Sequence, residues 1–320
     1  MATIDDALLR SLAPVRETGA HKGSVGGVMI LAGSPQFPGA SWLVSRSAGR
    51  NGAGIVYLAA PRSVIGIMAS SMPEVACVPL PETESARSAQ TAVERIYEKL
   101  ERVNAFVVGP GLGDDDSTDH LLSVLFGLSG AHGASWSGFG FGAESTASES
   151  SESIFTRTES TVVVDADGLN WLAKQDEWWN QIPEHRLVLT PHPLELHRLS
   201  GIEVDEIVAE PAAAAEQLAS KWKQTVVVKS GFTAASNGSE TVVSDLAPTS
   251  LATAGSGDCF AGAIGAFLAQ GCDAIGAATL AIGIGSLGAI KLEETFGEAG
   301  VIATDLPDAM AKALNTLKSI

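Results

Sequence analysis

The run VMILA at residues 28–32, followed by IVYLA at residues 55–59, decides the fold that the sequence predicts. Both runs are short and uniformly apolar, as strands are when helices cover both faces of a parallel sheet. A helix-compatible stretch at residues 40–50 lies between them, and Gly52 and Gly54 mark its end. We therefore predict a strand–helix–strand unit, from which parallel sheets are built.

Similar apolar runs continue along the chain and extend this sheet. Most are separated by helix-compatible segments, an alternation typical of a mostly parallel sheet with helices on both faces. The further predicted strands are residues 75–80, 105–108, 162–164, 187–189 and 225–228. The sequence thus predicts a three-layer α/β/α architecture in one domain over residues 1–320. Ser, Gly and Glu dominate residues 129–160, where we expect a flexible insertion that is either a lid or a loop without function.

The net charge and the cysteine content limit which partners the protein can bind and in which compartment it is expected. The formal net charge of −17 argues against nucleic acid and anionic membranes, because both bind Lys- and Arg-rich surfaces. Three cysteines without metal-ligand spacing favour a reducing compartment, and no histidine spacing indicates a dedicated metal site. The N-terminus shows no secretory signal, so we expect a cytoplasmic protein. Polar residues interrupt the apolar stretch 260–290, which we interpret as two buried helices and not as a transmembrane hairpin.

The loops that follow the predicted strands carry the candidate site. In sheets of this type, ligands lie beyond the carboxyl ends of the strands. Five such loops place glycine, histidine, aspartate or lysine directly after a strand. They are residues 33–34, 109–113, 165–167, 190–193 and 229–231. We expect them to converge on one cleft.

A sixth candidate is GSGDCFAG at residues 255–262, which opens a helix-compatible stretch. Free N–H groups and the dipole at a helix start bind phosphate, and Gly255, Ser256 and Gly257 let a ligand approach the backbone. Asp258 could accept a proton from a substrate hydroxyl at that place, or it could simply cap the helix. The motif on its own leaves both alternatives open.

Four further features of these loops have two interpretations each. Lys229 ends a buried strand, where its cation could meet a phosphate or lie on the surface. His192 stands between two prolines before a predicted helix and could face the cleft or be structural. Asp165 and Asp167 could hold Mg²⁺ through water, but capping of the following helix is the interpretation that we favour. The alternating glycines of residues 109–113 could meet a ligand or form a tight turn, and they do not make a GxGxxG motif.

The ordered set of motifs resembles the ADP/ATP-dependent NAD(P)HX dehydratase family, ribokinase-like enzymes that repair hydrated nicotinamide cofactors. The matching stretches keep the family's order and cover nearly the whole chain outside residues 129–160. They are residues 22–34 with 39–40, 109–113, 165–167 with Leu169, 189–193 with Glu195, 229–233, and 251–262. Single motifs also resemble hydroxyethylthiazole and pyridoxine-type kinases, so a vitamin or sugar-alcohol kinase remains the alternative.

The resemblance implies a hydro-lyase that removes water from (6S)-NADHX or NADPHX, with ADP or ATP as phosphoryl donor and Mg²⁺. The ring hydroxyl is phosphorylated, phosphate leaves, and NAD(P)H is restored. Asp258 is implied as the catalytic base. The implied substrate-binding residues are Ala40, Gly111, Gly113, His192 and Asp258. The implied nucleotide-binding residues are Lys229, Ser230, Gly231, Phe232, Thr233, Gly255, Ser256 and Gly257.

The resemblance also implies a stand-alone dehydratase domain and a homotetramer. Few residues precede Lys22, so we expect the NAD(P)HX epimerase to be a separate chain. Three places depart from the family's pattern. Phe37-Pro38 precedes Gly39-Ala40, where an aromatic residue and Thr are usual, and Leu194 and Ser230 stand where glycines are usual. We expect the side chain of Ser230 to crowd the phosphate path.

Overall fold

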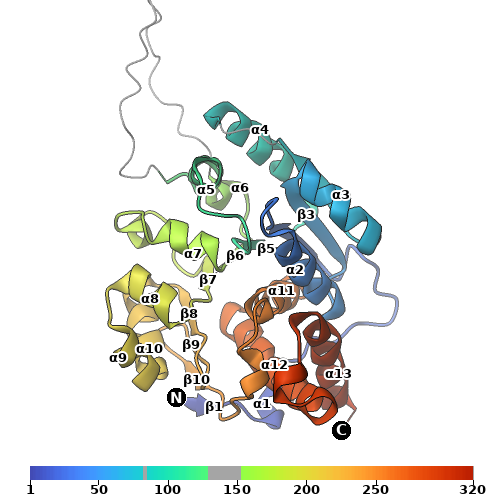
Figure 1. Ribbon diagram of the computed structural model, residues 1–320, viewed down its shortest axis with the longest axis vertical. Coiled ribbons are helices and arrows are strands. Elements are labelled where there is room, and N and C mark those ends of the chain that lie inside the picture. Colours follow the sequence, from blue (N-terminus) through green and yellow to red (C-terminus); the bar gives the residue numbers. More distant parts are fainter. Residues whose placement is uncertain (82–84, 129–152, 320) are drawn as a thin grey trace, which may run out of the picture.

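The computed structural model describes residues 1–81, 85–128 and 153–319, which form one ten-stranded sheet between two layers of helices (Figure 1). The strands are β1 (Ala2–Thr3), β2 (Gly27–Leu31), β3 (Ile55–Pro61), β4 (Ala76–Leu80), β5 (Ala105–Val108), β6 (Thr161–Val164), β7 (Leu187–Leu189), β8 (Thr225–Val228), β9 (Ala234–Ser236) and β10 (Thr241–Val243). Their order is β1-β10-β9-β8-β7-β6-β5-β2-β3-β4, and from β4 to β8 all neighbours are parallel. The predicted three-layer architecture is confirmed.

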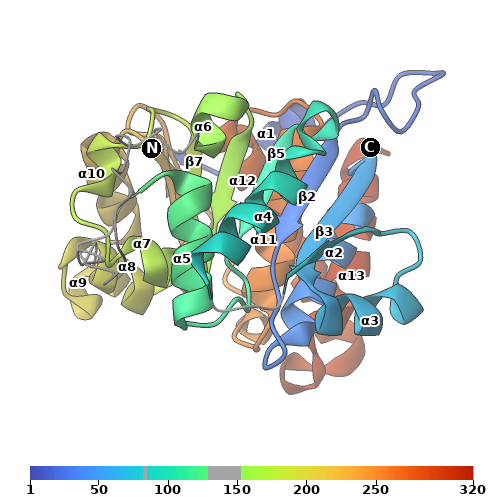
Figure 2. The ribbon, with the colours of Figure 1, turned by 90° about the horizontal axis from the view of Figure 1, so that it is seen from above.

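Each helix layer packs on one face of the sheet. One layer consists of α1 (Asp6–Leu12), α2 (Pro38–Arg50), α3 (Arg62–Ser71), α11 (Ser256–Ala269), α12 (Ala274–Phe296) and α13 (Leu306–Lys318). The other consists of α4 (Ala86–Tyr97), α5 (Asp116–Phe126), α6 (Ile154–Arg157), α7 (Asp167–Leu172), α8 (Pro193–Ser200), α9 (Val204–Ala209) and α10 (Pro211–Trp222). Figure 2, seen from above, shows α4 on one side of β2, with α2 and α13 on its other side.

The strands are apolar throughout because both of their faces are covered. In β2, Val28 and Ile30 belong to the core beneath α2 and α11, whereas Met29 and Leu31 belong to the core beneath α4 and α5. This alternation follows from the two-residue period of a strand. The uniform apolar runs in the sequence therefore report a sheet buried on both sides.

The chain enters the parallel part of the sheet in its middle. Strands β3 and β4 are added on one side of β2, and β5 pairs on the other side. The direction of strand addition thus reverses between β2 and β5, and such a reversal opens a crevice at the carboxyl ends. The N–H of Gly33 donates to the carbonyl of Pro110 over 2.8 Å and joins the two loops that follow β2 and β5.

Helix α11 approaches α2 and the sheet through glycines. A Cβ atom at Gly262 would overlap the carbonyl oxygen of Val44 in α2, and one at Gly265 would lie 2.5 Å from Cγ2 of Val107. The hydroxyl of Ser47 donates to the carbonyl of Cys259 over 2.5 Å and fastens the two helices. The start of α11 is therefore held in a fixed position relative to α2.

Two sequence predictions outside the site can be compared with the structure. The apolar stretch 260–290 forms the two predicted helices, α11 and α12. In the described part of the chain only α12 is long and apolar enough to cross a membrane, but 78% of its most apolar window is buried. The predicted flexible insertion is wrong at residues 153–160, because Ile154 and Phe155 are buried in the core and anchor α6. Residues 129–152 lie outside the described residues.

Candidate active site

The loops predicted from the sequence meet at the carboxyl edge of the sheet. The N–H of Gly113 donates to Oδ2 of Asp167 over 2.8 Å, which ties the loop after β5 to the loop after β6. The N–H of Lys229 donates to the carbonyl of Pro191 over 2.9 Å, which ties the loops after β7 and β8. The side chain of Lys229 then reaches back to Asp165. Loops that are far apart in the sequence therefore form one site.

A buried ion pair lies at its centre. Nζ of Lys229 is 2.5 Å from Oδ1 of Asp165, and Oγ1 of Thr190 donates to the same oxygen over 2.8 Å. Asp165 is only 1% exposed. Burial alone would lower the pKa of Lys229, but the negative charges of Asp165, Glu195 and Asp258 outweigh it and raise this pKa. The ammonium group therefore stays charged.

The favoured interpretation of Asp165 and Asp167 as helix caps is wrong. Helix α7 begins after Ala166, and no side chain caps its first turn. Asp165 is turned into the ion pair with Lys229, and Asp167 accepts a hydrogen bond from the loop after β5. Both partners are remote in the sequence, so the local pattern could not reveal them.

The start of α11 and the ammonium group of Lys229 form an anion cradle. The helix begins at Ser256, after Gly255 with φ of 90°, and a Cβ atom at Gly255 would lie 2.5 Å from Cδ1 of Leu43. A Cβ atom at Gly257 would lie 3.1 Å from Nζ of Lys229. The free N–H groups of the first turn and this cation thus border the same space, as in phosphate sites at helix starts.

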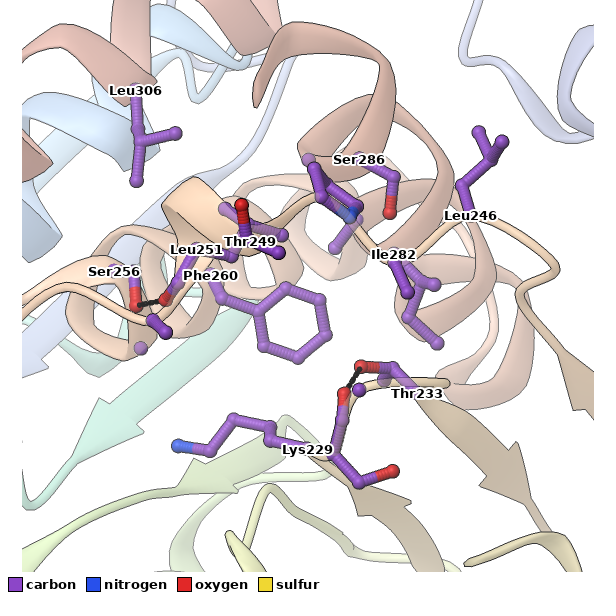
Figure 3. A pocket seen from close by; sticks show the side chains of 18 of the residues that line it. Lys229, Thr233, Leu246, Thr249, Leu251, Ser256, Phe260, Ile282, Ser286 and Leu306 are labelled. Carbon is purple, nitrogen blue, oxygen red and sulfur yellow. Dashed lines mark hydrogen bonds between the residues drawn. The ribbon is translucent and has the colours of Figure 1, made fainter. Parts of the chain in front are cut away.

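The cradle opens into a cavity of about 490 Å³ (Figure 3). Six predicted nucleotide-binding residues line it: Lys229, Ser230, Gly231, Thr233, Ser256 and Gly257. Gly255 caps the helix behind them and is not in the lining, and the side chain of Phe232 is 55% exposed. The rest of the wall was not predicted, and it consists of residues 246–249, 251–252, Phe260, Ala281, Ile282, Gly285, Ser286, Leu306 and Met310. This volume lies in the usual range for sites that bind small molecules.

Ser230 is engaged within its own loop. Its hydroxyl donates to the carbonyl of Phe232 over 2.9 Å, and Oγ1 of Thr233 donates to the carbonyl of Ser230 over 3.2 Å. The backbone of Ser230 does not adopt the left-handed conformation that would require glycine. The expected crowding of the phosphate path therefore finds no support in the position of this hydroxyl.

Asp258 is the third residue of α11 and does not cap it, so the capping alternative is wrong. Burial raises the pKa of its carboxyl to about 7, the negative charge of Asp165 adds to this rise, and Lys229 offsets part of it. Asp167 contributes a further increase. Within the described residues no hydrogen bond occupies the carboxylate. Asp258 can therefore exchange a proton near neutral pH.

His192 is the N-cap of α8 and takes part in a capping box. Its Nδ1 accepts the N–H groups of Leu194 and Glu195 over 3.2 and 3.3 Å, and Oε2 of Glu195 accepts the N–H of His192 over 2.8 Å. An acceptor at Nδ1 places the proton of the neutral ring on Nε2. The ring is half-exposed at the rim, and burial together with the charge of Lys229 lowers its pKa.

Glu195 is a site residue whose burial the sequence did not predict. It is 5% exposed, and burial raises the pKa of its carboxyl to about 7, although the charge of Lys229 opposes the rise. The available signal was its position three residues after His192, which is the spacing of a capping box. The site thus contains two acids with a pKa raised to about 7, the buried Glu195 and the partly buried Asp258.

The predicted substrate-binding residues Ala40 and Gly111 lie against each other. Gly111 has φ of 64°, and a Cβ atom there would lie 2.6 Å from Cβ of Ala40 and 3.0 Å from Cβ of Phe37. Ala40 is the third residue of α2, and the ring of Phe37 is 53% exposed beside it. A second cavity of about 250 Å³ lies between the ends of β2 and β3 and helices α4 and α5, and neither Ala40 nor Gly111 is in its lining. Glycine at position 111 is thus needed for the loop to approach α2.

The family model for NAD(P)H-hydrate dehydratase matches residues 28–127 and 133–312, which include every candidate site residue. The chain belongs to the NAD(P)H-hydrate dehydratase family. An ADP-dependent (S)-NAD(P)H-hydrate dehydratase from Streptococcus thermophilus is 30% identical over 268 residues, 83% of this chain and 82% of that protein. A bifunctional NAD(P)H-hydrate repair enzyme from Salinibacter ruber is 31% identical over 96% of this chain, which spans about half (51%) of that relative.

Solved structures of the same fold support the architecture. An ADP/ATP-dependent NAD(P)H-hydrate dehydratase from Bacillus subtilis, co-crystallised with ATP and Mg²⁺, has a TM-score of 0.77 at 22% identity and covers 99% of this chain and 98% of its own. A ribokinase-like superfamily protein from Enterococcus faecalis V583 has a TM-score of 0.75 at 19% identity and covers 100% and 97%. The predicted ribokinase-like fold is confirmed.

Proposed function

We propose that this dehydratase-family chain is an ADP-dependent (6S)-NAD(P)HX dehydratase that restores NAD(P)H by transient phosphorylation. One observation carries the proposal: Asp258, with a pKa of about 7, stands in the first turn of the helix that forms the anion cradle with Lys229. A proton acceptor and a phosphate site are thus held beside each other on one rigid element. This pair is what transfer of a phosphoryl group to a hydroxyl requires.

In the proposed reaction Asp258 accepts the proton of the ring hydroxyl as its oxygen bonds to the terminal phosphorus of ADP. The bond from that phosphorus to the bridging oxygen breaks, and AMP leaves. The ring C–O bond then breaks, inorganic phosphate carries the oxygen away, and loss of a ring proton restores the double bond. Lys229 and the first N–H groups of α11 stabilise the negative charge on the transferred phosphoryl group. The oxygen of the eliminated hydroxyl group therefore ends in the inorganic phosphate.

Mg²⁺ fits this site as a companion of the nucleotide phosphates. Among the described residues, no group of three or more His, Cys, Asp or Glu side chains is arranged to hold a metal ion. Magnesium in nucleotide sites usually takes one or two carboxylates, with phosphates and water as its other ligands. Asp165 can supply one oxygen, because Lys229 and Thr190 both use Oδ1 and Oδ2 lies towards Gly257 in the cradle.

The test is restoration of NADH absorbance from chemically hydrated NADH. We expect recovery with ADP or ATP and Mg²⁺, no recovery without nucleotide, and one inorganic phosphate released per NADH. Asp258→Asn should lower the rate of recovery by about 10²–10⁴-fold and leave the thermal unfolding midpoint close to that of the wild type. A stable phosphorylated product with no restored NADH would instead favour a small-molecule kinase. Running the assay with each nucleotide and with hydrated NADPH sets the donor and substrate preference.

The proposal extends to the partner enzyme, the oligomeric state and the location of the protein. Relatives named as bifunctional repair enzymes support a partnership with an NAD(P)HX epimerase that supplies the S form. We propose a homotetramer, as the family resemblance implies, and a location in the cytoplasm, as the N-terminal sequence predicts. The formal net charge of −17 supports the proposal that nucleic acid is not a partner. Size-exclusion chromatography with light scattering checks the assembly.

A further inference from the structure

Ser286 presents an unpartnered hydroxyl to the large cavity. The residue is only 4% exposed, lies on α12 and lines the cavity wall. Figure 3 shows its oxygen pointing into the cavity. Helical serine and threonine usually return such a hydroxyl to a carbonyl of the preceding turn, as Thr279 does to Ile275 over 2.7 Å. The hydroxyl of Ser286 makes no hydrogen bond to any residue that the structure describes.

The two ends of this cavity differ in chemistry. Lys229 and the start of α11 at Ser256 lie at one end and offer a cation and free N–H groups (Figure 3). Leu246, Ile282 and Ser286 lie at the other end, where two aliphatic side chains stand beside the serine hydroxyl. A nucleoside diphosphate has the matching asymmetry, because its phosphates are anionic and its base is flat, with polar atoms only at the edge.

We propose that Ser286 hydrogen-bonds to the edge of the nucleotide base and selects a nucleotide over a bare polyphosphate. Phosphates in the cradle leave the base only the far end of the cavity, where α12 forms the wall. A hydroxyl both donates and accepts, so it can meet a ring nitrogen or an exocyclic group of adenine. The inference rests on the proposed function and adds a specificity-determining residue to it. It also gives a partner to a cavity-facing hydroxyl that bonds to no residue of the described chain.

The experiment compares two ligands that share only the phosphate end. Isothermal titration measures binding of Mg–ADP and of Mg–pyrophosphate to the wild type, Ser286→Ala and Ser45→Ala. Ser45 is the matched control, because it is fully buried on α2, its hydroxyl has no partner among the described residues, and it lines neither cavity. Alanine is a strong helix former, so both variants should keep the wild-type thermal unfolding midpoint.

We expect Ser286→Ala to weaken ADP binding about fivefold, the usual effect of one lost hydrogen bond, and to leave pyrophosphate binding unchanged. Ser45→Ala should change neither. Unchanged ADP affinity in Ser286→Ala, or an equal loss for both ligands, overturns the assignment. The same holds for a wild type that binds pyrophosphate but not ADP. Because binding is measured without hydrated cofactor, a protein that fails the NADH assay can still support Ser286 as a base-recognising residue.

Discussion

The pKa of about 7 for Asp258 predicts how the proposed dehydratase activity depends on pH. A base must be deprotonated, and kcat/KM reports the pKa of the free enzyme. Below pH 7 we therefore expect kcat/KM to fall about tenfold per pH unit, to about 10% of its plateau near pH 6. An ordinary carboxyl, with a pKa near 3.8, would give no change in this range. The raised pKa of Asp258 should therefore appear as a fall of kcat/KM on the acid side of the pH profile, which we call the acid limb.

A neighbouring charge makes the prediction specific to Asp258. The carboxylate of Asp167 contributes to the raised pKa of Asp258. Asp167→Asn removes this charge and keeps an oxygen that can accept the N–H of Gly113. We expect the acid limb to move to lower pH by about half a unit to one unit. The assay is the initial rate of NADH recovery, measured with ADP and Mg²⁺ in constant-ionic-strength buffers.

Two further variants separate the possible sources of the limb. Glu195→Gln removes the other acid with a pKa of about 7 and should leave the limb in place. Asp258→Asn should lower the rate by about 10²–10⁴-fold. The reasoning is refuted by a flat profile between pH 6 and 8 in the wild type. It is equally refuted if Asp167→Asn moves the limb upward, or if Glu195→Gln removes the limb.

Three other predictions concern stability and binding. Folding raises the pKa of Glu195 from 4.5 to about 7, so the stabilising contribution of its protonated form is complete below pH 4.5 and is lost as pH rises through 7. The free energy of unfolding of Glu195→Gln, measured in urea, should therefore rise relative to that of the wild type by about 2–3 kcal/mol between pH 5 and pH 8. Gly262→Ala should destabilise by about 1–3 kcal/mol, because its Cβ atom meets backbone of α2. Gly66→Ala, a helix position with open space around it, should instead stabilise by about 0.5–1 kcal/mol, and equal effects would contradict this packing account. Ser230→Gly should leave the Kd for ADP in titration calorimetry unchanged, and a large gain in affinity would show that Ser230 does crowd the phosphates.

Much of the fold could be predicted because strands that are buried on both faces appear in the sequence as uninterrupted apolar runs. The apolar runs at residues 105–108, 187–189 and 225–228 match β5, β7 and β8 to the residue. Strands β1, β9 and β10 were missed because their sequences, AT, AAS and TVV, contain at most two large apolar residues in succession. The equally short β7 was found because all three of its residues, LVL, are large and apolar.

The positions of the site loops could be predicted, but not the partners of their side chains. The sequence places Lys229 and Asp165 at strand ends, yet the two are 64 residues apart and only the parallel sheet brings them together. The capping hypothesis failed at Asp165 for this reason. Ser286 stood within a Gly-rich apolar stretch with no sign of a ligand. Its significance depends on how α12 lies against the cavity, which no local pattern records.

The close packing of α11 on α2 has a consequence for how the two ligands could be aligned. Ala40 stands in the first turn of α2, and Asp258 stands in the first turn of α11. Because Gly262 lets the two backbones touch, the separation between these first turns is set by a rigid contact and not by a hinge. The proposed acceptor site at the first turn of α2 and the proposed donor site at the first turn of α11 are therefore held at a fixed separation. Their alignment is then built in when the chain folds, before either ligand arrives.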